Sequence, residues 1–328
     1  YASSYGITEF RQKICETTEK SRGFKPDLNQ VLVTPGANIA IFYAISCIVD
    51  PGEEVIVPDP GFPTYYSIIK MCNVVPVRVP LLESNKFRMN PKDIENSITE
   101  KTRMIVINSP QNPTGSVMTE EEIKMTYDIA KKHDLILYSD EIYARMIYKD
   151  SAFSSPSIYD KCQERTIISN GFSKAFAMTG WRLGAVIGPS HVIEKMKLLL
   201  ETTSSCVPPF IQKAGIEAIE GEQISQKNMY AEYEKRRDLI VNRINSISGL
   251  SCITPGGAFY VFVNIKKTGM TSEAFCEYML EDAGVAMLPG TSFGQFGEGF
   301  IRICYAVGQD EINNAFEKIK KSISRLDL

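Results

Sequence analysis

The sequence contains very few residues of the types that bind metals or build catalytic triads. Its 328 residues include only two histidines, His133 and His191, and one tryptophan. Each histidine stands among charged or helix-forming residues, which predicts a position on the surface. A histidine-rich metal site and a Ser-His-Asp triad both need histidine inside a cleft. We therefore expect neither, and no metal at the functional site.

The chain also lacks a long apolar run and a strong net charge. Its best apolar stretch, residues 39–49, falls well short of the roughly 20 residues that a bilayer span needs. Hydrophobic residues make up 44%, charged residues 23%, and the formal net charge is −3. This balance predicts an ordinary globular protein without the positive field that attracts nucleic acid or an anionic membrane. We expect neither as a partner.

Cysteine spacings typical of redox or zinc sites are absent too. The eight cysteines include no C-x-x-C pair, and most of them lie in apolar segments. Activated thiols need positive partners nearby, so the pattern favours buried, unpaired thiols in a reducing cytoplasm over disulfides or a catalytic cysteine. The chain begins at Tyr1 without an initiator Met or a signal peptide, which is compatible with a fragment and with a chain whose first segment is missing.

Seven short Val/Ile/Leu-rich runs alternate with helical stretches through the first two thirds of the chain. The runs cover residues 31–34, 55–58, 74–79, 104–108, 135–139, 166–169 and 184–188. Such continuous apolar content is typical of strands covered on both faces. Helical patterns lie between most of them, at 39–49, 120–132 and 192–203. We therefore predict an α/β fold, with a mainly parallel seven-stranded sheet and helices on both faces.

The pattern changes after Pro208-Pro209. One long helix is predicted from about residue 211 to 246, with Arg236 and Arg237 on its charged face. Strand-like runs follow at 258–263, 285–288 and 301–305, and helical stretches at 272–283 and from residue 310. This mixture predicts a smaller α+β unit. We expect a large domain over residues 1–208 and a small one over 209–328.

Polar residues follow four of the predicted strands. They are Gly36-Ala37-Asn38, Asn112, Asp140 with Tyr143, and Lys174. In open α/β sheets ligands bind beyond the carboxyl ends of the strands, so these residues should converge on one site. The N–H groups at the start of the helix that follows Gly36-Ala37-Asn38 would bind an anion such as a phosphate. No G-x-G-x-x-G follows a strand, which disfavours a dinucleotide.

Several of these side chains favour the chemistry of a carbonyl-bearing pyridine cofactor. Lys174 inside a cleft would lose its proton easily and attack a carbonyl carbon. Asp140 at a buried strand end needs a cation, which a protonated pyridine nitrogen would supply, although an aspartate helix cap is the alternative. Arg182 would fork onto a phosphate and Arg302 onto a carboxylate, and a structural ion pair is the alternative for Arg302. Phe62 would stack on the ring or belong to the core.

Seven blocks, in this order and over nearly the whole chain, resemble the class I/II aminotransferases of pyridoxal-phosphate fold type I. They are Y-A-S-S-Y-G-I-T-E-F-R (1–11), V-T-P-G-A-N (33–38), N-S-P-Q-N-P-T-G (108–115), S-D-E-I-Y (139–143), N-G-F-S-K-A-F-A-M-T-G-W-R-L-G (170–184), P-G-G-A-F-Y (255–260) and I-R-I-C-Y-A (301–306). The resemblance implies pyridoxal 5′-phosphate as cofactor. It also implies ping-pong transfer of an amino group from an L-amino acid, aromatic or aspartate-like, to a 2-oxo acid such as 2-oxoglutarate.

The resemblance further implies a role for each matching residue. Lys174 would form the Schiff base with the cofactor and carry protons, and Asp140 would face the ring nitrogen. The remaining cofactor contacts would be Asn112 and Tyr143 at the ring oxygen, Phe62 on the ring face, and Ala37, Asn38 and Arg182 at the phosphate. Arg302, with Asn112, would hold the substrate carboxylate. Tyr1 would reach the phosphate in a neighbouring subunit, which implies a homodimer with shared sites.

The sequence departs from the family pattern at two positions. Gly171 stands where many members have a phosphate-binding serine, and Asn38 stands where some aspartate-using relatives have a lysine. The second departure favours aromatic substrates. The family also usually has a further N-terminal segment over the site. Two other functions are compatible with the same residues: a β-lyase acting on a sulfur amino acid, and a non-catalytic sensor that binds the cofactor.

Overall fold

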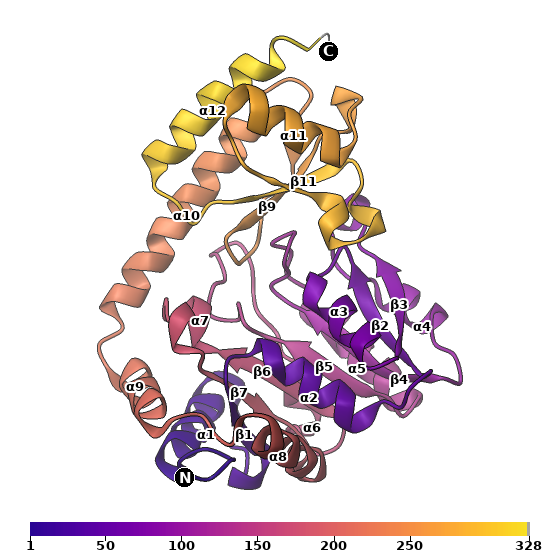
Figure 1. Cartoon of the computed structure of the whole chain (residues 1–328), viewed down its shortest axis with the longest axis vertical. Helices are drawn as coiled ribbons and strands as arrows, with labels where there is room; N and C mark the ends of the chain where they lie inside the picture. Colours follow the sequence, from indigo (N-terminus) through magenta and orange to yellow (C-terminus); the bar gives the residue numbers. More distant parts are fainter. Residues whose placement is uncertain (327–328) are drawn as a thin grey trace.

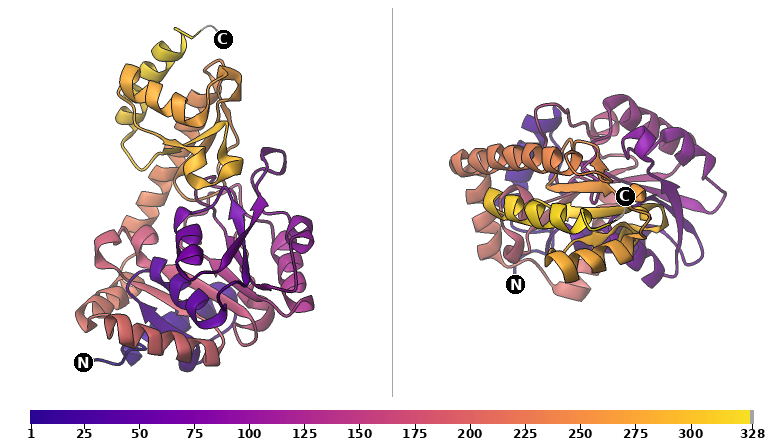
Figure 2. Two further views of the ribbon diagram at one scale, coloured as in Figure 1. Left: turned by 45° about the vertical axis from the view of Figure 1, so that its right-hand side comes forward. Right: turned by 90° about the horizontal axis from the view of Figure 1, so that it is seen from above.

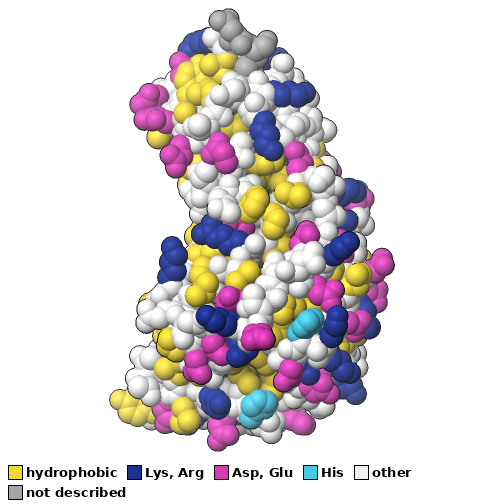
Figure 3. Space-filling view, turned by 90° about the vertical axis from the view of Figure 1, so that its right-hand side faces the viewer, with side chains coloured by type: hydrophobic (Ala, Val, Ile, Leu, Met, Phe, Trp, Pro, Cys, Tyr) yellow, Lys and Arg dark blue, Asp and Glu magenta, His cyan; other side chains and the backbone are white. Residues whose placement is uncertain are grey.

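The computed structural model describes residues 1–326, which form two units around two separate sheets (Figure 1). The larger unit holds the N-terminal two thirds of the chain, and the long helix α10 (Ile224–Asn245) leads from it to the smaller one (Figures 1 and 2). On the face drawn in Figure 3 the surface narrows between the units, and charged side chains of both signs are spread over it.

The large sheet has seven strands in the order β1-β7-β6-β5-β4-β2-β3. Only β7 runs antiparallel to its neighbours, so the predicted, mainly parallel α/β fold is confirmed. The strands are β1 (Val31–Thr34), β2 (Glu54–Asp59), β3 (Val75–Pro80), β4 (Thr102–Asn108), β5 (Ile136–Asp140), β6 (Thr166–Gly171) and β7 (Gly184–Ile187).

Helices cover both faces of this sheet because successive strand residues point to opposite sides. In β4, Met104 and Val106 pack with α2, α3 and α8, whereas Ile105 and Ile107 pack with α4 and α5. Helix α1 covers the part of the second face formed by β1, β6 and β7. The helices of this unit are α1 (Thr8–Arg22), α2 (Asn38–Ile48), α3 (Pro63–Met71), α4 (Pro91–Asn96), α5 (Glu120–Lys132), α6 (Ser157–Asp160), α7 (Phe172–Ala175) and α8 (Ser190–Ser204).

The smaller unit is an antiparallel sheet in the order β10-β11-β9-β8, packed against three helices. Apolar residues of α10, α11 and α12 meet β9 and β11 in one cluster, for example Ile244, Phe275, Phe316 and Val261. The elements are β8 (Ser251–Cys252), β9 (Tyr260–Asn264), α11 (Ser272–Ala283), β10 (Leu288–Pro289), β11 (Phe300–Cys304) and α12 (Gln309–Ile323). Of the strand expected at 285–288, only Leu288 lies in β10.

The single helix expected over residues 211–246 is wrong. The segment forms α9 (Pro209–Glu220) and α10, because the chain turns out of the helix at Gly221. The N–H of Gly221 closes α9 on the carbonyl of Glu217, and a Cβ there would come within 2.8 Å of that oxygen. Helix α9 packs against α1, and Gln212 accepts a hydrogen bond from the N–H of Ile7.

Two further expectations about individual side chains are corrected. Arg237 does not lie on a charged face but is 2% exposed, since its guanidinium stacks on Tyr148 and pairs with carboxylates at the edge. Of the eight cysteines, all unpaired, only Cys15, Cys162 and Cys276 are buried, while Cys304 is exposed. Within residues 1–326 no helix has the length and apolar character of a membrane span, and no acidic, Cys or His cluster suits a metal.

Candidate active site

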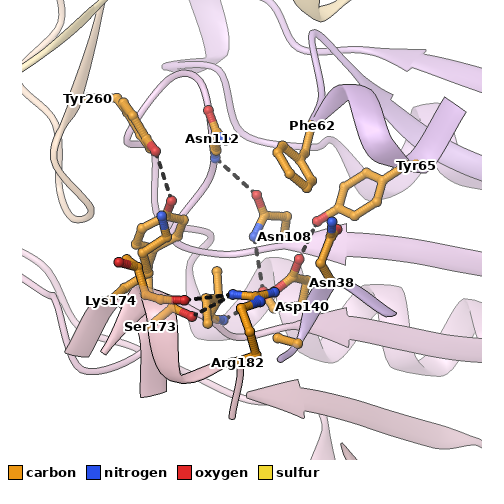
Figure 4. A pocket seen from close by; sticks show the side chains of 14 residues that line it. Asn38, Phe62, Tyr65, Asn108, Asn112, Asp140, Ser173, Lys174, Arg182 and Tyr260 are labelled. Atoms are coloured by element: carbon orange, nitrogen blue, oxygen red, sulfur yellow. Dashed lines mark hydrogen bonds between the residues drawn. The ribbon is translucent and has the colours of Figure 1, made fainter. Parts of the chain in front are cut away.

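A cleft of about 250 Å³ opens at the carboxyl ends of the central strands, and the four predicted strand ends meet there (Figure 4). The large unit supplies almost all of its lining, and Tyr260 comes from the small one. The lining residues are Ala37, Asn38, Phe62, Tyr65, Asn108, Asn112, Asp140, Ile142, Tyr143, Ser173, Lys174, Thr179, Arg182 and Tyr260. The predicted convergence is therefore confirmed.

Asp140 forms part of the lining at the end of β5, with one side of its carboxyl facing the cleft. Its Oδ2 accepts a hydrogen bond of 2.5 Å from the Tyr65 hydroxyl, and its Oδ1 accepts one of 3.2 Å from the N–H of Ile142. No cationic side chain of the described residues pairs with it. Burial raises the pKa of the carboxyl above its ordinary value, and the hydrogen bond from Tyr65 opposes that rise.

Lys174 follows β6 within the short helix α7, and its ammonium lies 5.4 Å from the centre of the Phe259 ring. It forms no ion pair with any residue that the structure describes. Burial lowers the pKa of the amine, nearby Cys304 opposes this, and the positive charges of Arg302 and Arg182 lower the pKa further. The amine is therefore more readily neutral, as a nucleophile must be.

One end of the cleft has the features of an anion-binding site. Helix α2 begins there after Ala37, which offers no side-chain cap to the N–H groups of the first turn. Gly36 has φ +86°, and a Cβ on it would lie 2.5 Å from Arg182 Nη2, so the guanidinium sits directly over this turn. Arg182 Nη1 is also 3.5 Å from Ser173 Oγ. The N–H groups at the start of α2, the guanidinium of Arg182 and the hydroxyl of Ser173 thus lie around the same end of the cleft.

Gly171 lies close to Ile142 and Ala37. A Cβ at this position would approach Ile142 Cδ1 to 2.7 Å and Ala37 Cβ to 3.3 Å, so a serine does not fit without displacing Ile142. The hydroxyl next to Arg182 comes instead from Ser173, immediately before Lys174.

Asn112 and Tyr143 are held on the side of the cleft nearer the small unit. The N–H of Asn112 donates to Asn108 Oδ1 over 3.0 Å, and Asn108 in turn donates to the carbonyl of Asp140. The Tyr143 hydroxyl lies 3.0 Å from the Tyr260 hydroxyl. Burial raises the pKa of Tyr143 well above its ordinary value, so this phenol stays protonated and remains a hydrogen-bond donor.

Arg302 extends from β11 to the edge of the cleft. It donates to Asn112 Oδ1 over 3.0 Å and lies 4.4 Å and 4.7 Å from the ring centres of Tyr260 and Phe293. Its Nε has no hydrogen-bond partner, and no carboxylate of residues 1–326 pairs with it. The structural ion pair considered as the alternative is therefore absent within these residues, and the guanidinium is available to an incoming planar anion.

Phe62 and Tyr1 complete the expected set. Phe62 lines the cleft just before α3 and packs edge-to-face on Tyr65, with ring centres 5.6 Å apart. Tyr1 is fully exposed and contributes nothing to the cleft of its own chain.

Several residues that line the cleft were not predicted from the sequence. Tyr65 in α3 stands three positions after Phe62, which immediately precedes this helix, and Asn108 is paired in register with Asp140. Tyr260 ends the block P-G-G-A-F-Y, and Ser173 directly precedes the lysine. The i, i+3 spacing and the adjacency to known positions were available signals, although none of them specifies a contact.

The chemistry of the donor set fits pyridoxal phosphate. Asp140 is a carboxylate without an internal cation, Lys174 is an amine without an internal anion, and Arg182 with the start of α2 awaits a phosphate. The aromatic ring of Phe62 and the neutral donors Asn112 and Tyr143 line the same cleft. Each unmatched group corresponds to one substituent of that cofactor.

The comparisons with known proteins agree with this fit. Residues 1–319 match the family model for aminotransferase class I and II. The chain is 42% identical over 324 residues to aspartate aminotransferase of Pyrococcus abyssi (strain GE5 / Orsay), covering 98% of this chain and 83% of the relative. It is 39% identical over 331 residues to aromatic-amino-acid aminotransferase 2 of Thermococcus litoralis, covering 100% and 85%.

Solved structures give the same answer. The fold matches that of the aromatic aminotransferase from Pyrococcus horikoshii OT3 with a TM-score of 0.96 and 40% identity, covering 99% of this chain and 88% of that one. Aspartate aminotransferase from Thermus thermophilus with maleate matches with a TM-score of 0.93 and 33% identity, covering 98% and 83%.

Proposed function

The chain belongs to the aminotransferase class I and II family, and on this premise we propose which residues carry the reaction and which substrates it takes. The protein is a pyridoxal-phosphate-dependent aminotransferase, so the expectation of transamination is confirmed. Its substrates are amino acids and 2-oxo acids.

Lys174 binds the cofactor covalently and moves the substrate proton. The observation that supports this most is that its amine is unpaired, depressed in pKa and placed in the same cleft as Asp140. When bound, pyridoxal phosphate supplies the electron sink that accepts the electron pair of the substrate α-carbon. The Nζ of Lys174 would hold the cofactor through its carbonyl carbon. As a free amine it would take the α-proton of the substrate and return it to the carbon that takes up the amino group.

The remaining residues bind and orient. Asp140 holds a proton at the ring nitrogen, and Asn112 and Tyr143 donate to the ring oxygen. Ala37, Asn38 and Arg182 bind the phosphate together with Ser173, and Phe62 packs on the ring face. Arg302, steadied by Asn112 and by the two aromatic rings, holds the α-carboxylate of both substrates in turn. A single carboxylate site used alternately by the two substrates suits a ping-pong order.

We favour an aromatic amino acid over aspartate as donor and 2-oxoglutarate as acceptor. Asn38 is exposed at the rim and neutral, and no lysine stands at that position. A donor panel tests this choice: kcat/KM should be higher for phenylalanine and tyrosine than for aspartate, with a new amino acid as product. Asn38→Lys should shift the ratio toward aspartate. A higher kcat/KM for aspartate in the unaltered enzyme would contradict the preference, and pyruvate with ammonia as products would contradict transamination.

The domain division, the assembly and the location remain proposals as well. We propose domains over residues 1–208 and 209–328, with α9 tying the second to the first through its packing on α1. We further propose a cytoplasmic homodimer in which Tyr1, fully exposed, reaches the phosphate site of the other subunit. Sedimentation of the holoenzyme as a monomer at micromolar concentration would contradict the dimer.

A further inference from the structure

Among residues 1–326, Tyr65 is the only side chain that donates a hydrogen bond to the carboxyl of Asp140, and it has none of the proposed contacts with the cofactor or the substrate. Its hydroxyl lies 2.5 Å from Oδ2, and the other donor to the carboxyl is a backbone N–H, that of Ile142. The two donors occupy different oxygens. The carboxyl is therefore held in one orientation, and its side toward the cleft stays open.

The local sequence leaves the Tyr65 hydroxyl no other acceptor. The residue is 1% exposed, its ring packs edge-to-face on Phe62, and Pro63 at the first position of α3 fixes the start of the helix. The only side-chain or backbone acceptor that its hydroxyl meets among the described residues is Asp140. Burial and the neighbouring carboxylate raise the pKa of Tyr65 well above its ordinary value, so the phenol remains a donor at working pH.

The charge environment of Asp140 makes this donor matter. The titratable groups around the carboxyl are Tyr65 from α3, Tyr138 and Glu141 beside it in the chain, and Tyr143 in the following turn. None of them is a cation. Since burial and the charge of Glu141 both favour the neutral acid, the phenol of Tyr65 is the main side-chain group favouring the carboxylate.

We propose that Tyr65 is a positioning residue that keeps Asp140 ionised and aimed, so that the proton shared by Asp140 and the cofactor stays on the ring nitrogen. The proposal rests on the proposed role of Asp140. A carboxylate that has lost a charged hydrogen bond becomes a stronger base, and the shared proton would then move toward the carboxylate. The ring would accept electrons less well, although the substrate would bind as before.

The chain offers a matched control in the next residue. Tyr66 also loses a single buried hydrogen bond when changed to phenylalanine, because its hydroxyl donates to the carbonyl of Pro58 over 2.5 Å. It does not line the cleft and does not contact Asp140. Tyr65→Phe and Tyr66→Phe therefore differ in which acceptor is left without its donor, at equal side-chain volume.

The experiment loads the unaltered enzyme and the variants with pyridoxal phosphate labelled with ¹⁵N in the ring and records the nitrogen chemical shift. Tyr65→Phe should move the shift from the protonated toward the neutral pyridine value, while Tyr66→Phe should leave it unchanged. The kcat of Tyr65→Phe should fall roughly 10- to 100-fold, as expected for one lost hydrogen bond to a charge, with KM nearly constant. An unchanged shift in Tyr65→Phe would overturn the proposal.

The variant Asp140→Asn distinguishes the proposed role of Tyr65 from the proposed role of Asp140 on which it rests. If that variant kept the protonated shift, the role assigned to Asp140 would be wrong. If it lost the protonated shift while Tyr65→Phe retained it, only the role of Tyr65 would fall. Incorporation of 3-fluorotyrosine at residue 65 covers the case in which Tyr65→Phe does not fold. This more acidic phenol keeps the contact, and the shift should move further to the protonated side; a shift toward neutral pyridine would count against Tyr65.

Discussion

Two carboxylates that are neighbours in the chain, Asp140 and Glu141, lie on opposite sides of the large sheet and have opposite surroundings. Glu141 is fully buried against α1, where Arg22 forms an ion pair with it and Ser155 and Ser139 donate to its Oε1. Asp140 faces the cleft and meets only a phenol and a backbone N–H. Burying a charge is costly unless it is paired. The paired carboxylate is therefore structural, whereas the unpaired one suits the proposed ligand site.

Two arginines repeat the contrast. Arg237 stacks on Tyr148 with carboxylates of Asp150, Glu234 and Asp238 around it. Arg302 is stacked in a similar way on Tyr260, but within residues 1–326 its guanidinium donates only to the amide oxygen of Asn112. Stacking alone does not distinguish a structural arginine from one that binds substrate. We use the missing counter-charge to make this distinction. Mutations of the paired residues and of the unpaired residues should therefore have different consequences.

The largest effect is expected at Lys174. Lys174→Ala removes both the amine that binds the cofactor and the group that transfers the proton, so kcat should fall by more than about 10³-fold. The visible absorption of the bound cofactor should also change. Lys213→Ala, at an exposed lysine paired with Glu9, serves as the control and should retain normal activity and spectrum. An unchanged spectrum in Lys174→Ala would refute the assignment.

The next largest effect concerns stability at Glu141. Glu141→Gln leaves the guanidinium of Arg22 buried without a counter-charge, which should lower the free energy of unfolding by about 3 kcal/mol. Urea unfolding of the cofactor-free protein measures this value. Asp140→Asn is the matched change on the other face and should not destabilise the same form. Equal losses in both variants would abolish the distinction between the two carboxylates.

A smaller effect is expected at Arg302, and it concerns binding. Arg302→Met should raise the dissociation constants of the amino acid and of the 2-oxo acid roughly 10- to 100-fold, because one charged and bidentate contact is lost. Stability should change little. Arg237→Met should do the reverse, lowering the midpoint of unfolding while leaving KM unaffected. A raised KM in both variants would show that a missing counter-charge does not distinguish a substrate-binding arginine from a structural one.

The smallest effect is the pH dependence of stability at Asp140. Its pKa is raised in the folded state, so the folded protein binds this proton more tightly and loses stability as pH rises through the window above the ordinary carboxyl value. Cofactor-free Asp140→Asn should therefore melt at a slightly higher temperature than the unaltered protein near pH 7. The difference should vanish below about pH 4, where the carboxyl is neutral in both states. A difference that does not depend on pH would contradict this account.

Strand runs, the parallel sheet and the convergence of four strand ends could all be predicted from local pattern. Apolar periodicity determines which segments become strands, and parallel strands bring their carboxyl ends to one edge. The break between α9 and α10 was harder to predict, because the pattern of residues 211–246 is helical throughout. The break occurs at Gly221, whose N–H closes α9 on the carbonyl of Glu217. The burial of Arg237 depended on carboxylates up to 87 positions away.

The sequence by itself determined the type of fold and identified Lys174, Asp140 and Arg302 as candidate site residues. Both depend on periodicity and on recurring blocks of residues. Only the tertiary structure decided which charges remain without partners, that the Ser173 hydroxyl lies beside Arg182, and that Tyr65 lies against Asp140. Those outcomes depend on distances between segments far apart in the chain. Such distances are set by how helices and strands pack on one another, which no local pattern encodes.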